Sequence, residues 1–118
     1  QFGDATTKVA REARGSSATR ALLIGGTRPE PSASTIIDYF TMATLGNAVQ
    51  FGDSTASNSN SAGTSDSIRV AFAHGNNPSR TDKIDYINIS TGGNAIDFGN
   101  LTAARDHPGG CSNGHGGL

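Results

Sequence analysis

Three soft metal ligands lie close together near the C-terminal end of the sequence. His107, Cys111 and His115 follow one another at intervals of four residues. On a helix this spacing would place two imidazoles and a thiolate on one face, which is a ligand set that zinc prefers. The intervening Pro-Gly-Gly and Ser-Asn-Gly residues prevent a helix there, so only a loop or a symmetric assembly could gather the three side chains. They are weak candidates for a metal site, and we expect neither a metal nor another cofactor.

Two long stretches of the chain, residues 35–53 and 82–100, are close copies of each other. Tyr39 and Tyr86 illustrate the offset of 47 residues, which holds through an Ile-Asp-Tyr segment, a Gly-Asn-Ala segment and a Phe-Gly pair. The opening QFGD recurs verbatim at residues 50–53, at an offset of 49. The sequence therefore predicts a tandem repeat. We expect a first repeat over residues 1–49, a second over residues 50–97, and a partial third over residues 98–118 that shares strands with a neighbouring chain.

Each repeat is predicted to consist of short strands. Apolar residues make up 34% of the chain, Trp is absent and Gly occurs 16 times, so one large aromatic core is excluded. Short apolar runs such as ALLI and RVAF stop at or shortly before a glycine, Gly25 and Gly75 respectively, and the Gly-Asn pairs are suited to tight hairpin turns. Long helical periodicity is missing. Composition and pattern together indicate an all-β fold.

Several residue types recur at matching places in the two repeats. Asp38 and Asp85 carry carboxylates that a reaction could use, but a catalytic site would not need to appear in every repeat. We expect each of them to accept hydrogen bonds from backbone N–H groups or to pair with the repeated arginine. His74, which stands where the first repeat has Gly25, is expected to be a structural hydrogen-bonding group. The residues that we assign to the repeated scaffold are Arg20, Asp38, Tyr39, Phe51, Arg69, Asp85, Tyr86 and Phe98.

The repeat length and the order of residues resemble those of kelch-type β-propeller blades. Kelch repeats are about 50 residues long, and their order of a glycine pair, a tyrosine and a later large aromatic residue is matched here by Gly25-Gly26, Tyr39 and Phe51. The resemblance implies four-stranded antiparallel blades. Two repeats and a fraction cannot bury their apolar faces alone, because roughly three stacked units are usually needed. We therefore expect a ring completed by homo-oligomerisation, with a trimer favoured.

Most of the chain also resembles tandem repeats found in structural and tail-associated proteins of marine bacteriophages, especially those that infect cyanobacteria. The segments that carry this resemblance are IDYFTMATLGNAVQFGD, IDYINISTGGNAIDFGNLTAAR and GGCSNGHGGL. The resemblance implies a component of the virion, with other virion proteins as partners. It implies no catalytic residues.

Charge and hydropathy narrow the choice of partners further. The nine Lys and Arg residues nearly balance the ten Asp and Glu residues, so no field of one sign attracts nucleic acid or an acidic membrane surface. The longest apolar run, ALLIGG, is far shorter than the roughly 20 residues of a transmembrane helix, and no signal-peptide pattern precedes it. We expect a soluble chain, without membrane insertion, that is located in the virion.

These features favour a non-enzymatic structural or adhesion module of a phage particle. Because the scaffold repeats while the loop over residues 54–66 differs between the repeats, the variable surface is a candidate for binding a cell-surface glycan. The candidate contacts are Arg11, Arg14, Asn58 and Asn60. One alternative is a propeller enzyme that acts on glycans at a chain interface, and the non-repeated groups it could use are Asp106, His107, Cys111 and His115. Another alternative is a fragment of a longer repeat protein.

Overall fold

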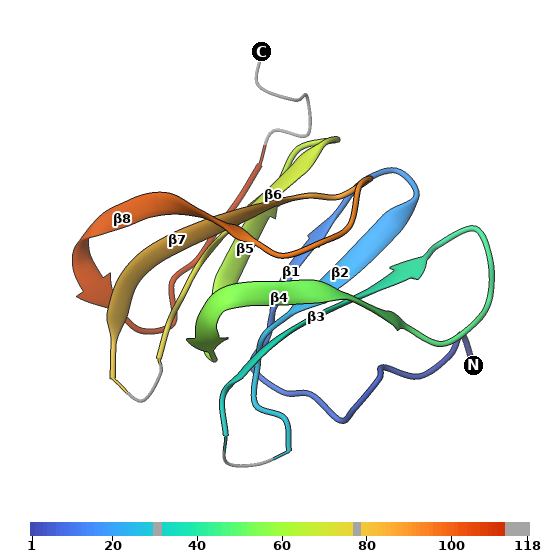
Figure 1. Ribbon diagram of the computed structural model, residues 1–118, viewed down its shortest axis with the longest axis horizontal. Coiled ribbons are helices and arrows are strands. Elements are labelled where there is room, and N and C mark those ends of the chain that lie inside the picture. Colours follow the sequence, from blue (N-terminus) through green and yellow to red (C-terminus); the bar gives the residue numbers. More distant parts are fainter. Residues whose placement is uncertain (30–31, 77–78, 113–118) are drawn as a thin grey trace.

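The computed structural model describes residues 1–29, 32–76 and 79–112, and no helix occurs within them. Two four-stranded antiparallel sheets make up the fold (Figure 1). The first sheet consists of β1 (Ala13–Ser16), β2 (Arg20–Ile24), β3 (Ser34–Thr41) and β4 (Val49–Asn58). The second sheet consists of β5 (Ala62–Ser65), β6 (Arg69–Ala73), β7 (Thr81–Asn88) and β8 (Ile96–Arg105). The predicted all-β fold is confirmed.

The two sheets are copies of each other in topology and register. Each is a meander, in which strands that follow one another in sequence are hydrogen-bonded neighbours. The register irregularity between Ile37 and Asp38 on β3 recurs between Ile84 and Asp85 on β7. The sequence repeat is therefore a repeat of strand pairing as well as of residue type.

The chain passes from one sheet to the other between β4 and β5, at residues 59–61. The repeat boundaries expected from the sequence lie after residues 49 and 97. These positions are at the beginning of β4 and of β8, the last strand of each sheet, and not in the connection between the sheets. A tandem sequence repeat has the same period wherever its first residue is placed, so the sequence does not determine where one unit ends. The hydrogen bonds of the sheets do determine it, because each strand belongs to one sheet. Residues 98–105 accordingly belong to the second sheet as part of β8.

An apolar core lies between the two sheets. Its members come from both of them, and among the described residues they are Ala13, Leu22, Ile24, Ile37, Phe51, Val70, Phe72, Ile87 and Ile89. Strand β1 lies against β5, and this approach requires glycine, because a Cβ on Gly63 of β5 would clash with the Arg14 carbonyl oxygen on β1. Each large apolar side chain buried in this way contributes about 1.5–3 kcal/mol. The two repeats therefore stabilise each other.

Strand β4 pairs with β3 and also forms hydrogen bonds with the second sheet. The Phe51 carbonyl oxygen accepts a hydrogen bond from the Gly93 amide at 3.1 Å, and the Asp53 carbonyl oxygen accepts one from the Ala95 amide at 2.8 Å. The Asp53 amide donates to Asn94 Oδ1 at 3.1 Å. The turn between β7 and β8, which contains the predicted Gly-Asn pair, is thus bonded to the last strand of the first sheet.

Candidate functional site

A buried carboxylate in the second repeat receives hydrogen bonds from two other segments. Asp85 on β7 is fully buried. The Thr55 amide and hydroxyl donate to Asp85 Oδ2 at 2.9 and 2.7 Å, and His74 Nε2 donates to the same oxygen at 2.8 Å. Burial on its own raises the pKa of Asp85, but the hydrogen bonds from His74 and Thr55 outweigh it, so this pKa lies below its ordinary value. Asp85 is therefore ionised at neutral pH and ties β4 and the end of β6 to β7.

The first repeat has an equivalent carboxylate, Asp38 on β3, with a different hydrogen-bond donor. Arg28 Nη1 and the Thr6 hydroxyl each donate to Asp38 Oδ2 at 2.6 Å. Arg28 Nε also donates to the Gly25 carbonyl oxygen at 3.0 Å. The side chains of Arg28 and Asp38 are both buried. Because Gly25 stands at the position of His74, an arginine from the following loop supplies the hydrogen bond that the imidazole provides in the second repeat.

The His74–Asp85 pair contains groups used in acid–base catalysis, but its arrangement does not support a reaction. The Thr55 hydroxyl bonds to the Asp85 carboxylate and not to the imidazole, so the three groups do not form the hydroxyl–imidazole–carboxylate chain of a catalytic triad. His74 Nδ1 is buried without a hydrogen-bond partner in the described part of the chain, and its ring stacks on Phe72 with the centroids 5.5 Å apart. A substrate cannot reach side chains that are at most 1% exposed. The pair is a structural element of the fold.

Acid is expected to weaken the fold through Asp85. Because its pKa is lower in the folded chain, this carboxylate stabilises the fold fully above its unfolded pKa of about 4, and the contribution is lost as the pH falls through the lower folded value. We expect the free energy of unfolding to decrease as the pH falls below about 4, and to decrease less steeply in Asp85→Asn. Urea titrations at a series of pH values measure both slopes, and equal slopes would contradict this role.

The repeated arginines lie over tyrosine rings. The guanidinium carbon of Arg20 is 4.7 Å from the centre of the Tyr39 ring, and that of Arg69 is 5.8 Å from the centre of the Tyr86 ring. Neighbouring residues on a strand point to opposite faces of the sheet, so an arginine on the tyrosine face cannot meet the preceding aspartate, Asp38 in the first repeat. Of the two partners expected for the repeated aspartates, the repeated arginine is therefore wrong, since it makes a cation–π contact. The other, a backbone N–H group, is found at Asp85, which accepts from the Thr55 amide.

The four candidate glycan contacts are placed differently by the fold. Arg14 is exposed and forms an ion pair with Glu12 at 2.6 Å. Arg11 is exposed, and its carbonyl oxygen accepts a hydrogen bond from the Asn60 amide at 2.8 Å. Arg11 and Asn60 therefore lie together although they come from different repeats. Asn58 is fully buried, so its side chain cannot contact a ligand at the surface in this conformation.

The non-repeated acid and imidazole near the C-terminal end lie side by side. His107 Nδ1 is 3.3 Å from Asp106 Oδ1, and Cys111 is a free, exposed thiol. His115 lies outside the described residues. Within residues 1–29, 32–76 and 79–112, no group of three or more His, Cys, Asp or Glu side chains could hold a metal ion. This region therefore offers no metal centre among those residues.

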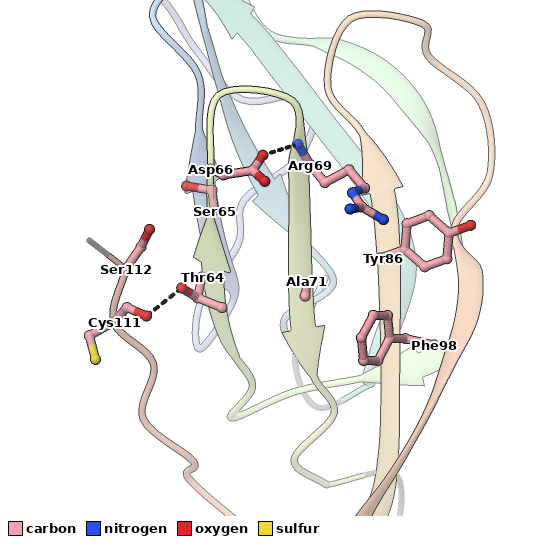
Figure 2. A pocket seen from close by; sticks show the side chains of 9 residues that line it. All are labelled: Thr64, Ser65, Asp66, Arg69, Ala71, Tyr86, Phe98, Cys111 and Ser112. Carbon is pink, nitrogen blue, oxygen red and sulfur yellow. Dashed lines mark hydrogen bonds between the residues drawn. The ribbon is translucent and has the colours of Figure 1, made fainter. Parts of the chain in front are cut away.

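An open hollow of about 330 Å³ lies on the second sheet and is lined by members of the repeated scaffold. Figure 2 shows Arg69, Tyr86 and Phe98 on one side of it. On the other side lies Cys111, whose carbonyl oxygen accepts a hydrogen bond from the Thr64 hydroxyl at 2.6 Å. An arginine beside aromatic rings is typical of surfaces that dock another protein segment.

Three polar residues of the buried clusters were missed by sequence reasoning. Thr6 and Thr55 lie 49 residues apart, the offset of the QFGD copies, so extending that alignment could have found them. Arg28 has no basic counterpart at an offset of 47 or 49. No repeated pattern therefore pointed to it.

No protein-family model matches the chain, and no curated protein sequence is similar to it. The described ranges contain no helix of the length and apolar character that crossing a membrane requires. Function is therefore inferred from the residues and contacts of the chain itself.

Proposed function

We propose that the chain is a non-enzymatic structural or adhesion module, built of two kelch-like β-propeller blades and assembled from several chains in a phage particle. The observation that best supports this proposal is the duplication of the buried polar contacts. Asp38 accepts a hydrogen bond from the hydroxyl of Thr6, and Asp85 accepts one from the hydroxyl of Thr55. A scaffold needs such contacts in every unit, whereas a catalytic site needs them once.

The form of the sheets favours propeller blades. A blade is a four-stranded antiparallel sheet, and blades are arranged radially around a central channel. Here the strands of each sheet follow in sequence order, from β1 to β4 and from β5 to β8. The sheets pack face to face, and the first strands, β1 and β5, lie against each other. In a ring of such sheets β1 and β5 would lie nearest the axis.

The adhesion role that we propose uses the exposed polar surface next to β1. Arg11, Arg14 and Asn60 present donor groups there, with the backbones of Arg11 and Asn60 joined by a hydrogen bond. Guanidinium groups bind carboxylates and other planar or tetrahedral anions in paired hydrogen bonds. Acidic glycans are therefore the sugar class that this surface fits best.

A glycan array probed with the intact protein tests this role. We expect binding to acidic glycans that is weakened about tenfold in the double variant Arg11→Ala, Arg14→Ala, because charged hydrogen bonds contribute about 1.5 kcal/mol or more. Arg80→Ala, which removes an exposed arginine elsewhere, should bind like the wild type. Absence of binding to every glycan would remove the adhesion role, and release of sugars from bound glycans would favour a glycan-cleaving enzyme instead.

A further inference from the structure

Two phenylalanines at matching positions differ sharply in burial. Phe51 on β4 and Phe98 on β8 each make an edge-to-face contact with the tyrosine of the neighbouring strand, with centroids 5.8 and 6.1 Å apart. Phe51 is 8% exposed, whereas Phe98 is 61% exposed. The exposed face that carries Phe98 is therefore the counterpart of a face that is buried between the two sheets.

The repeated arginines show the same difference. Arg20 Nη1 donates to the carbonyl oxygens of Ile89 and Ser90 in the second sheet, at 2.9 and 3.3 Å. Arg69 keeps the same place over its tyrosine, beside the hollow in Figure 2. No residue in the described part of the chain accepts a hydrogen bond from its guanidinium. The exposed face thus presents an aromatic ring and a cation that its buried counterpart uses to hold another sheet.

The first sheet carries the complementary surface, and residues 1–10 lie on it. The Phe2 carbonyl oxygen accepts a hydrogen bond from the Gly46 amide at 3.0 Å. The Asp4 amide donates to Asn47 Oδ1, also at 3.0 Å. These bonds reproduce those that β4 makes to the turn between β7 and β8. Residues 1–10 therefore occupy the position that the last strand of a preceding sheet would take.

Residues 1–10 make only some of the hydrogen bonds that a strand makes at this position. Asp85 accepts hydrogen bonds from both the amide and the hydroxyl of Thr55, whereas Asp38 accepts one from the Thr6 hydroxyl. Asp38 Oδ1 is buried and has no hydrogen-bond partner among the described residues. Thr102 on β8 stands 47 residues after Thr55. Strand β8 therefore carries the residue type that can complete the contacts of this carboxylate.

We infer that the exposed face of the second sheet binds the first sheet of a second copy of this chain. Strand β8 of one copy replaces residues 1–10 of the next, and Phe98 takes the place of Phe2, which lies against Phe40 with centroids 5.3 Å apart. The neighbour's β1 lies along β5, where Cys111 now bonds. The contact joins two different surfaces, so its repetition closes a ring or extends a filament. This inference rests on the proposed repeat scaffold and specifies its interface.

Light scattering of the intact chain over a range of concentrations tests this interface. Phe98→Ser should weaken self-association about thirtyfold or more, because it removes a central aromatic contact. Ile96→Ser is the matched control, since Ile96 lies on the same strand and is 55% exposed, and its counterpart Val49 stays 55% exposed in the first sheet. Gly3→Ala should strengthen association, because a Cβ there would clash with the Gly46 carbonyl oxygen and expel the segment that blocks the site.

Association that depends on Phe98, in the wild type or in Gly3→Ala, supports the inference. The inference is overturned if the wild type and Gly3→Ala both stay monomeric, or if Phe98→Ser associates as strongly as Ile96→Ser. Arg69→Ala removes an exposed side chain and its contact with the Tyr86 ring. It should also weaken association, which keeps the test decisive if Phe98→Ser does not fold. No glycan is present in this experiment, so a failure of the adhesion role and a failure of the interface give separate results.

Discussion

Asp85→Ala is expected to lower the free energy of unfolding by about 3–5 kcal/mol. The substitution removes the acceptor of the hydrogen bonds from Thr55 and from the buried His74. An imidazole left buried without a partner accounts for most of the cost, because an intact buried pair gains little beyond the loss of its hydration. Urea unfolding at pH 7, followed by circular dichroism, measures the difference from the wild type.

Asp82→Ala provides the matched control, because Asp82 lies on the same strand and is not fully buried. We expect it to change the free energy of unfolding by no more than about 0.5 kcal/mol. Asp85→Asn, which keeps the shape and some of the hydrogen bonds, should fall between these two variants. Equal losses in Asp85→Ala and Asp82→Ala would show that the buried carboxylate does not anchor the fold.

Phe51→Ala is expected to cost about 3–5 kcal/mol, whereas Phe98→Ala should cost less than about 1 kcal/mol. The two phenylalanines have the same strand position and the same kind of contact with a tyrosine. They differ in whether another sheet covers them. The difference between the two losses therefore measures the contribution of the contact between the sheets at this position.

This comparison requires protein concentrations at which the chain is monomeric, because a second copy that covers Phe98 would raise the cost of removing it. Unfolding curves at two such concentrations that coincide establish this condition. Equal losses for Phe51→Ala and Phe98→Ala under that condition would contradict the packing of β4 against the second sheet.

The strands could be predicted from the sequence because their signals are local. An apolar run that ends at glycine, and a Gly-Asn pair followed by an apolar residue, indicate a strand and a turn without reference to the rest of the chain. The offset between Tyr39 and Tyr86 added that both units have the same design. Pairing order and register followed the repeat closely, as the matching irregularities of β3 and β7 show.

The partners of the buried carboxylates could not be predicted in the same way. Arg20 repeats and was the natural choice for Asp38, but which face of the strand each side chain takes decides the pairing. Arg28 and His74, the actual partners, do not repeat. What repeats is the buried carboxylate, and each unit satisfies it with the hydrogen-bond donor that its own loop or strand end brings within reach.

The sequence also could not show which residues of the variable loop over residues 54–66 are exposed and which are buried. Asn58 belongs to a Ser-rich and Asn-rich stretch that is typical of solvated loops. In the fold it ends β4, and its side-chain amide donates to Ser54 Oγ at 3.0 Å and to the Ala56 carbonyl oxygen at 3.2 Å. A low-complexity composition thus conceals a residue whose polar groups are satisfied inside the protein.

The sharing of β4 between the two sheets determines how the chain loses its structure. In repeat proteins the stability of the array is close to a sum of the intrinsic stabilities of the units and the interface terms between neighbours. Here β4, the last strand of the first sheet, also forms backbone hydrogen bonds with the turn between β7 and β8, and its Thr55 donates a hydrogen bond to the buried Asp85. Melting of either sheet removes part of the other, so we expect the two repeats to unfold as one cooperative unit.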